Sequence, residues 1–451
     1  MVAQVIVDVV HTNVARPFSY LVPEGAEISV GARVSVPLGR RRVDGIVVEL
    51  LDNPPDGLPL EKLRPVGAML DDCPALLPAL LDLARELSAQ AHCPLAETLR
   101  LMLPAAMRTG RVKRKKELYV RLADGVDGET AAQAQRRAPK RATLLRLLAG
   151  GELRAVKELE PLVNQPREAL HALEKAGLVV LEEREVFRAP EGEADAAHTQ
   201  PPEWTPDQRE ALDTMLPALR RGEGAFLLHG VTGSGKTEVY LAMVAETLKA
   251  GKGAIILVPE IALTPQMVRW FRARFGPETA VLHSRLTDGQ RCDEWRRIRL
   301  GAARVAVGAR SAVFAPFDNL GLIVVDEEHE GSYQSESAPR YHAVEVAQRR
   351  AQAAGAPLLL GSATPSLLTY FRACSGRYRL LELPERVMRR PLPAVEVVDM
   401  REEFLSGNNG IFSGRLVSLL GECLETGRQA MLFMNLSLIH ISEPTRLDVI
   451  S

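Results

Sequence analysis

The stretch from Gly224 to Lys249, GAFLLHGVTGSGKTEVYLAMVAETLK, restricts the possible folds of this chain more than any other. It joins an apolar run, a loop that fits G-x-x-x-x-G-K-[ST], and a helix-type run. The loop residues are Gly230, Val231, Thr232, Gly233, Ser234, Gly235, Lys236 and Thr237. In this order the backbone N–H groups of the loop can surround a phosphate at a helix N-terminus, where the helix dipole favours an anion. The sequence therefore predicts a nucleotide-binding α/β domain.

A cluster of acids follows the apolar run LGLIVV and begins at Asp326. Asp326 at a strand end can hold Mg²⁺ opposite the Thr237 hydroxyl, and Glu327 beside it can polarise an attacking water. Lys236 would reach the β- and γ-phosphates of the nucleotide. We expect a motor, because small-molecule kinases rarely carry D-E-x-H here. A GTPase would need D-x-x-G and N-K-x-D motifs, which do not occur at the expected positions.

A third polar stretch, GSATPS (Gly361–Ser366), follows the apolar run PLLL. Small hydroxyl residues at a strand end can sense, by hydrogen bonding, the state of the nucleotide at Asp326–His329. Taken alone, the stretch also fits a generic turn. Its place after the two preceding motifs favours the sensing role.

Composition limits the class of protein. The chain has 451 residues with a net charge of −1, 46% hydrophobic and 25% charged. At about 150 residues per domain, this length predicts about three soluble domains. We expect a cytoplasmic protein without a membrane partner, because the N-terminus resembles a strand and no apolar run is long enough to span a bilayer. The five cysteines show no C-x-x-C spacing, so we expect reduced thiols and neither a metal nor a disulfide framework.

The N-terminal part is rich in strand-type runs. QVIVDVV, FSYLVP, ARVSVPL and VDGIVVEL predict a small β-barrel or sandwich, and a helical pattern follows from Cys73 to Leu103. The run RTGRVKRKK (Arg108–Lys116) then carries six cations in nine residues. It fits either a solvated linker or a segment that follows a phosphate backbone.

Residues 136–188 predict a small helical domain. Three short helices and a strand pair around LVVLEEREVF give the outline of a winged helix, and residues 189–203 form a polar linker. Beyond the linker, the short apolar runs GAFLLHG, GAIILVPE, VAVGAR, LGLIVVDEE and PLLLGSAT alternate with helix-type segments. Such runs are typical of a parallel sheet that is buried on both faces.

The motifs together resemble superfamily 2 helicases of the DEAH-box kind, with DEEH (Asp326, Glu327, Glu328, His329) in place of DEAH. Further stretches resemble the family of bacterial primosomal protein N′ (PriA), the replication-restart helicases. These stretches are RPFSYLVP, VPEIALTPQ, LHSRLTDGQR, VGARSAVFAPF and DEEHEGSYQSESAPRYHAVEVA. The resemblance covers residues 1 to about 434.

The resemblance implies a multidomain α/β protein with five parts. They are a β-rich domain that binds DNA 3′ ends (1–105), a winged-helix domain with basic and polar linkers (106–200), a RecA-like helicase lobe that binds ATP (201–400), the start of a second lobe (401–435) and a tail outside the family (436–451). It also implies an ATP- and Mg²⁺-dependent 3′→5′ DNA helicase that recognises stalled or abandoned forks and assembles a primosome. The implied partners are branched and single-stranded DNA, a nascent 3′ end, primosome proteins and single-stranded DNA-binding protein, in the nucleoid.

The family motifs also assign roles to single residues. Gln208 matches the glutamine that reads adenine in related helicases, although an ordinary surface glutamine would look the same. Tyr333, Arg340, Tyr341 and His342 fall in what resembles an aromatic-rich loop that couples DNA to hydrolysis. Aromatic rings in this loop could stack on unpaired bases, each worth about 1–3 kcal/mol. The other interpretation is that Tyr341 is a core aromatic.

The resemblance stops at Asn435. The family continues with an arginine-glycine-rich stretch, whereas LSLIHISEPTRLDVIS follows here and resembles translated sequencing-adapter read-through. We therefore expect a fragment that lacks the zinc cysteines of the family, its remaining helicase motifs and its arginine fingers. Such a fragment would hold no zinc and would be inactive as a helicase.

Two other functions remain open at this point. A nucleotide-dependent DNA-binding adaptor that never unwinds would show the same motifs. Another superfamily 2 translocase, of the type I restriction or transcription-repair kind, would share the helicase motifs as well. The RPFSYLVP stretch argues against the translocase, because such proteins begin differently.

Overall fold

The computed structural model describes residues 1–8, 16–55, 59–108, 112, 114–188, 203–260, 265–387 and 394–433. Lys113, Asn435 and the expected tail 436–451 lie outside these ranges. The chain divides into two compact units, Met1–Arg389 and Arg390–Ser451. No helix among the described residues is long and apolar enough to cross a membrane.

An antiparallel four-stranded sheet opens the chain. Its strands are β1 (Val2–Val7), β2 (Phe18–Leu21), β3 (Arg33–Leu38) and β4 (Arg41–Leu51), in the order β2-β1-β4-β3. One face buries Ala3, Val5 and Val7 against Val34 and Val36. The alternation of the sequence thus gives one apolar face, and the expected small β domain is confirmed.

Helices α1 (Pro78–Ala91), α2 (Leu95–Met102) and α3 (Ala105–Arg108) follow a short turn, η2 (Leu60–Lys62). Their apolar side chains belong to the same buried cluster as one face of the parallel sheet described below. The Trp295 indole N–H donates to the Met102 carbonyl at 3.3 Å, and Arg299 Nε donates to the Pro74 carbonyl at 3.0 Å. The N-terminal helices are therefore packed on the nucleotide-binding domain.

A three-stranded antiparallel sheet, ordered β6-β5-β7, belongs to the next domain. Its strands are β5 (Lys116–Leu122), β6 (Arg154–Ala155) and β7 (Val179–Glu185). Its helices are α4 (Gly128–Ala134), α5 (Pro139–Leu147), α6 (Val156–Leu159) and α7 (Pro166–Lys175). The strand pair expected within LVVLEEREVF is instead the single strand β7, because its long-range partner β5 supplies the hydrogen bonds. The helices share one core of leucines, valines and alanines.

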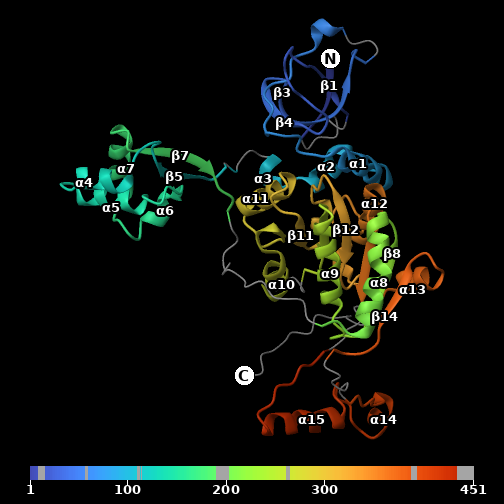
Figure 1. Cartoon of the computed structure of the whole chain (residues 1–451). Coiled ribbons are helices and arrows are strands. Elements are labelled where there is room, and N and C mark those ends of the chain that lie inside the picture. The colour runs from blue at the N-terminus through green and yellow to red at the C-terminus, as the bar shows by residue number, and fades with distance from the viewer. Residues whose placement is uncertain are drawn as a thin grey trace. The chain divides into compact units, whose positions relative to one another are not determined.

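A seven-stranded parallel sheet carries the nucleotide-binding motifs (Figure 1). Its order is β10 (Thr279–Leu282), β11 (Val305–Gly308), β9 (Gly253–Leu257), β12 (Leu320–Val325), β13 (Leu358–Ser362), β8 (Ala225–Gly230) and β14 (Arg379–Leu383). Five of these strands coincide with the apolar runs of the sequence. The two edge strands, β10 and β14, did not stand out in the sequence. The RecA-like sheet is confirmed.

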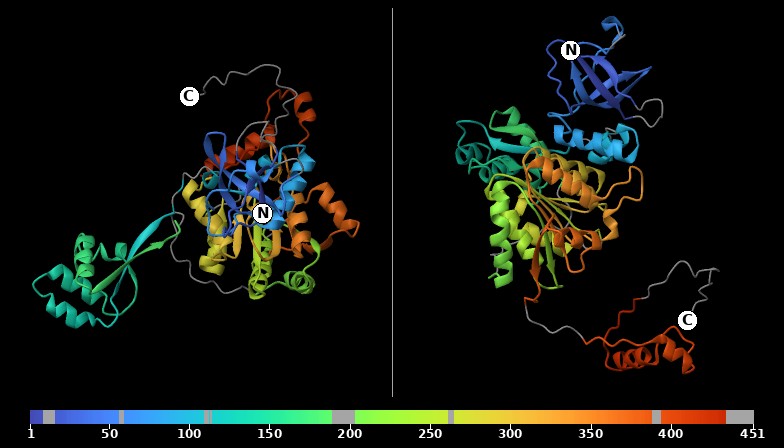
Figure 2. Two further views of the ribbon diagram at one scale, coloured as in Figure 1. Left: turned by 90° about the horizontal axis from the view of Figure 1, so that it is seen from above. Right: turned by 90° about the vertical axis from the view of Figure 1, so that its right-hand side faces the viewer.

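Helices cover both faces of this sheet (Figure 2). On one face α8 (Pro206–Arg221), α9 (Lys236–Lys249) and α10 (Pro265–Phe275) pack on alternate strand residues such as Leu228, Ile256 and Val324. On the other, α11 (Asp288–Arg299) and α12 (Ala343–Ala354) pack on the intervening residues. Burial on both faces explains why the strands are continuously apolar.

The second unit contains α14 (Met400–Leu405) and α15 (Gly414–Glu425). Neither helix has a buried side chain. Residues 428–433 form no strand, although their sequence RQAMLF is largely apolar, and Met431 is 98% and Phe433 is 91% exposed. A strand needs a neighbour for its backbone hydrogen bonds, and the described residues of this unit include no second strand.

Candidate nucleotide and nucleic-acid site

Three neighbouring strands bring the three motifs together. β8, β13 and β12 lie side by side and parallel, so their carboxyl ends meet at one edge of the sheet. β8 leads into the phosphate loop, β13 into GSATPS and β12 into the DEEH box. This edge is where open α/β sheets bind their ligands.

The phosphate loop has the backbone expected for anion binding. Gly233 and Gly235 have φ values of +83° and +81°, which favour glycine. Helix α9 begins at Lys236 without a side-chain cap on its first N–H groups. The Ser234 hydroxyl is buried and has no hydrogen-bond partner among the described residues. An uncapped helix start beside an unpaired buried donor fits the oxygens of a nucleotide phosphate.

Lys236 lies at the centre of the site. Its ammonium donates to the Gly230 carbonyl at 2.8 Å and lies 3.9 Å from Glu327 Oε1. The side chain is buried, and these contacts satisfy its charge. Glu327 itself has a φ of +44°, an uncommon conformation for a non-glycine residue. Unfavourable backbone conformations of this kind cluster at functional sites.

Asp326 is the buried acid of the site. Tyr240 Oη donates to its Oδ1 at 2.9 Å, and Tyr333 Oη donates to its backbone carbonyl at 2.7 Å. Burial raises the pKa of the Asp326 carboxyl, while the hydrogen bond from Tyr240 opposes that rise. Burial also raises the pKa of both tyrosines well above the ordinary value, so both hydroxyls remain donors.

The donor atoms fit a hard cation. The Asp326 carboxylate and the half-buried Thr237 hydroxyl supply oxygen ligands, which Mg²⁺ prefers. They belong to the same strand-end edge as the phosphate loop. Asp326 and Thr237 could therefore hold a Mg²⁺ ion that accompanies a nucleotide.

The rest of the DEEH box connects to GSATPS. His329 Nδ1 lies 2.8 Å from Ser362 Oγ, and its Nε2 lies 3.4 Å from Thr364 Oγ1. The Glu328 carboxylate accepts from Ser366 N at 2.6 Å and from Thr369 Oγ1 at 2.9 Å. These contacts anchor the start of α13 (Leu367–Cys374) to the acids. The hydrogen bonds proposed between the two motifs thus exist in the structure.

Gln208 lies behind the phosphate loop. Its Nε2 donates to the Ser234 carbonyl at 3.0 Å, and its Oε1 accepts from Thr205 N at 3.0 Å as part of a capping box. Only 3% of the residue is exposed, so it is no ordinary surface glutamine. The role in reading adenine stays a prediction.

The aromatic-rich loop differs from expectation. Tyr333 is 0% and Tyr341 is 8% exposed, so neither ring is free to stack on a base. Tyr341 packs against Phe314 with ring centroids 5.2 Å apart, and His342 Nδ1 accepts from Val344 N at the start of α12. Of the four residues assigned to this loop, Arg340 alone is exposed. The stacking interpretation is therefore not supported for the two tyrosines, because packing of the loop buries them.

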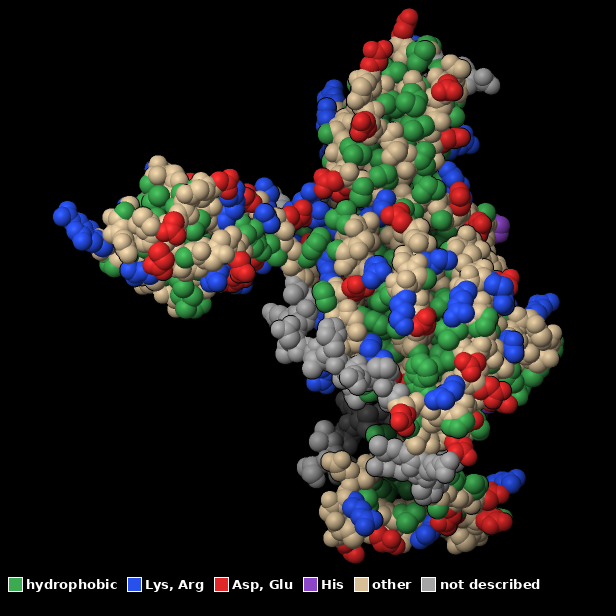
Figure 3. Space-filling view, viewed as in Figure 1, with side chains coloured by type: hydrophobic (Ala, Val, Ile, Leu, Met, Phe, Trp, Pro, Cys, Tyr) green, Lys and Arg blue, Asp and Glu red, His purple; other side chains and the backbone are tan. Residues whose placement is uncertain are grey.

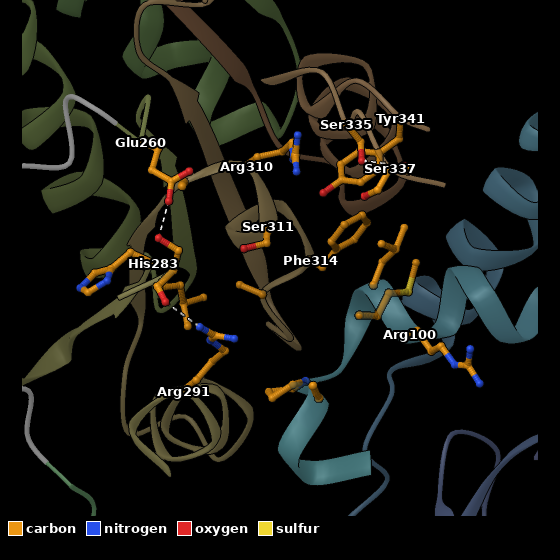
Figure 4. Close-up of a pocket in the computed structure, with 18 of the residues that line it drawn as sticks. Arg100, Glu260, His283, Arg291, Arg310, Ser311, Phe314, Ser335, Ser337 and Tyr341 are labelled. Atoms are coloured by element: carbon orange, nitrogen blue, oxygen red, sulfur yellow. Dashed lines mark hydrogen bonds between the residues drawn. The ribbon is translucent and has the colours of Figure 1, made fainter. Parts of the chain in front are cut away.

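A hollow of about 810 Å³ lies beside this loop (Figure 4). Glu260, His283, Arg291, Arg310 and Ser337 line it, and each comes from one of the family-like stretches of the sequence. Arg100, from α2, lines it as well. The Ser284 hydroxyl donates to the Glu260 carboxylate, and Arg291 Nη2 donates to the Ser284 carbonyl at 3.0 Å. Arginines and small polar residues around an open hollow suit a phosphate backbone.

The structure adds two features that sequence reasoning missed. Tyr240 contacts Asp326, although nothing in the motif marks a helix tyrosine as part of the site. The segment after β14 crosses the phosphate loop, since Val387 N donates to the Gly233 carbonyl at 3.1 Å. The Nε of Arg386 in this segment is buried without a partner among the described residues. In the sequence, the cation-rich stretch LPERVMRR was the feature that could have indicated a contact of this segment with the phosphate loop.

Two family models match the chain. Residues 4–104 match the PriA 3′ DNA-binding domain, and residues 205–370 match the DEAD/DEAH box helicase. The first covers the N-terminal sheet with α1 and α2, and the second covers all three motifs of the site.

Relatives match over most of the chain. Replication restart protein PriA of Bacillus subtilis (strain 168) is 38% identical over 502 aligned residues, covering 96% of this chain and 62% of the relative. The protein of the same name from Synechocystis sp. is 36% identical, covering 93% and 59%. The chain thus spans about three fifths of the length of these relatives. Among solved structures, RecG bound to a three-way DNA junction matches 41% of this chain and 24% of its own, at 22% identity and a TM-score of 0.32.

Proposed function

Since the chain belongs to the family of replication restart protein PriA over the part that they share, we propose that it forms the nucleotide-binding part of an ATP-dependent DNA helicase. The whole protein would recognise stalled or abandoned forks, move 3′→5′ and restart replication by assembling a primosome. A DEAD/DEAH box domain uses a nucleotide and Mg²⁺, and we propose ATP as that nucleotide.

One observation carries the proposal. The phosphate loop, DEEH box and GSATPS lie at the ends of three adjacent strands. The ion pair of Lys236 with Glu327 joins the first two motifs, and the hydrogen bond between His329 and Ser362 joins the last two. Lys236 would exchange its present partners, Gly230 and Glu327, for phosphate oxygens. Glu327 would then be free to orient the attacking water. Mg²⁺, when bound, would neutralise charge on the phosphates.

DNA contact is proposed for two regions. The hollow lined by Arg291 and Arg310 would hold the phosphates of a single strand, as the presence of arginine beside small hydroxyl residues supports. The β-rich domain would hold a nascent 3′ end. Primosome proteins and single-stranded DNA-binding protein are proposed as partners of the whole protein.

The distribution of charged side chains supports attraction of DNA at local sites rather than by the whole surface. Acidic and basic side chains are interspersed on the visible face of the molecule (Figure 3), in line with the net charge of −1. A nucleic-acid site in this chain would therefore depend on local groups of cations, such as the arginines around the hollow.

The test uses forked DNA with the 451-residue chain. We compare forks whose nascent strand ends at the branch with a 3′-hydroxyl or with a 3′-phosphate. The hydroxyl forks should bind more tightly, because the phosphate makes the end larger and adds negative charge to it. Equal affinity for both ends would remove the end-binding role and favour another superfamily 2 translocase. In a longer version that continues into the second lobe, ATP-dependent binding without strand separation would favour an adaptor.

A further inference from the structure

Asp326 is held from two sides by buried tyrosine hydroxyls. Tyr240 on α9 bonds to the carboxylate at 2.9 Å, and Tyr333 bonds to the backbone carbonyl at 2.7 Å. Tyr240 is 1% and Tyr333 is 0% exposed. Neither hydroxyl belongs to the phosphate loop or to the DEEH box. Both contacts fall on Asp326, the acid that is proposed to hold Mg²⁺.

The Tyr240 hydroxyl also lies against the third motif. A Cβ atom on Gly361 would come within 1.7 Å of Tyr240 Oη, so only glycine leaves room for the hydroxyl at this point of β13. Tyr240 follows Lys236 by one helical turn, and residues so spaced share a helix face. A single side chain thus links α9, which carries Lys236, to Asp326 and to the start of GSATPS.

Tyr333 plays the corresponding part for the loop that follows the acids. It ends the short helix η5 (Gly331–Tyr333) and begins a loop that returns to α12. Ser335 N donates to the Tyr341 carbonyl at 2.8 Å, and Gln334 pairs with His342, so residues 333–342 form a closed loop. A displacement of this loop that moves Tyr333 must also break or shift the bond to Asp326.

We propose that Tyr240 and Tyr333 are positioning residues for Asp326. Tyr240 orients the carboxylate so that an oxygen faces the Mg²⁺ of the bound nucleotide, and Tyr333 ties the Asp326 backbone to the loop 333–342. The inference rests on the proposed nucleotide site and adds the residues that organise it. A buried carboxylate without a fixed donor would turn or pair elsewhere, so the metal ligand would lose its preset direction.

The first experiment separates metal binding from nucleotide binding. ADP affinity is measured by calorimetry, with and without Mg²⁺, for the parent chain, Tyr240→Phe and Tyr378→Phe. Tyr378 is the matched control, because it is also buried and its hydroxyl donates to Gln348 at 3.0 Å, away from Asp326.

We expect Tyr240→Phe to bind ADP alone as the parent does, while the gain in affinity from Mg²⁺ falls about tenfold, as for one hydrogen bond to a charged group. Gly361→Ala should reproduce this loss by displacing the same hydroxyl, and Tyr378→Phe should keep the full gain. A full Mg²⁺-dependent gain in Tyr240→Phe would overturn the role of Tyr240.

The second experiment needs no nucleotide. Amide hydrogen exchange should accelerate over residues 333–342 in Tyr333→Phe and stay at the parent rate there in Tyr378→Phe. Amide exchange at the parent rate over residues 333–342 in Tyr333→Phe would overturn the proposal that Tyr333 links this loop to Asp326. Unchanged protection of the N-terminal β strands would show that each variant is folded. A parent chain that binds no ADP would overturn the proposed function, while the exchange result would still decide the role of Tyr333.

Discussion

Lys236 and Glu327 lie 3.9 Å apart, ammonium to carboxylate, at the facing ends of the phosphate loop and the DEEH box. In this arrangement the lysine charge is shared between Glu327 and the Gly230 carbonyl. These two contacts hold the lysine beside the phosphate loop, where a bound phosphate could replace them.

Replacing Lys236 with alanine should remove most of the affinity for Mg·ATP. The lost interaction is a charge-assisted contact in a largely buried site, worth about 2–3 kcal/mol. Lys249→Ala is the matched control, because it lies at the far end of the same helix and pairs only with exposed Glu246 among the described residues. Calorimetry that finds equal affinity for both variants would contradict the assignment of the phosphate loop.

Replacing Glu327 with glutamine should spare nucleotide binding or strengthen it. Glutamine keeps the shape, while the negative charge that now competes for Lys236 is lost. We expect Mg·ADP affinity equal to or above that of the parent. In a version of the protein with both lobes, turnover should fall by about 10²–10⁴, the usual contribution of a positioned base. Parent-level turnover in that variant would exclude the proposed role of Glu327 in water attack.

The described cations of the basic run Arg108–Lys116 pair with carboxylates. Arg108 pairs with Asp8 at 3.0 Å, Arg114 with Asp72 at 2.7 Å and Lys116 with Glu183 at 3.3 Å. Carboxylates thus already neutralise these cations, which favours the linker interpretation over phosphate tracking.

Neutralising Arg114, Lys115 and Lys116 together should therefore leave the salt dependence of DNA binding nearly unchanged. Three true phosphate contacts would flatten the slope of log K against log salt by about 2.7, at about 0.9 for each contact. Arg340→Ala is the comparison, since Arg340 is exposed and the described residues offer it no ion pair. A flatter slope for the triple variant, measured by fluorescence anisotropy, would restore the phosphate-tracking interpretation.

Local patterns in the sequence were enough to predict the phosphate loop and five strands of the parallel sheet. Strand β14 carries the charged residues Arg379 and Glu382, and β10 begins at the polar Thr279, so each edge strand offers only a short apolar run to detect. The pairing of β5 with β7 joins segments about sixty residues apart, which a local pattern cannot show. The burial of Tyr333 and Tyr341 has the same cause. Whether an aromatic ring faces DNA or a core depends on tertiary packing rather than on its neighbours in sequence.

The most demanding prediction concerns ATP turnover by the 451-residue chain. Lys236, Thr237, Asp326 and Glu327 all lie at one edge of one sheet. In a two-lobe motor, arginine fingers from the facing lobe contribute about 10³–10⁵ to the rate. The described part of the second unit, residues 394–433, forms two helices without a buried side chain, and Phe404, Val417 and Leu424 are exposed. The described residues of this unit form no core that could hold an arginine in a fixed direction.

We therefore expect this chain to bind Mg·ATP, to hydrolyse it slowly with or without DNA, and to unwind no fork. Exposed apolar side chains on α15 should also make residues 394–433 exchange amide hydrogens faster than β8, β12 and β13, because few packed contacts oppose local opening. A coupled-enzyme assay of phosphate release, with Lys236→Ala as the background control, measures the turnover. Strong DNA-stimulated turnover above that background would contradict this expectation. It would mean that residues after Arg389 supply the positive charge of the arginine fingers, so that the second unit takes part in hydrolysis.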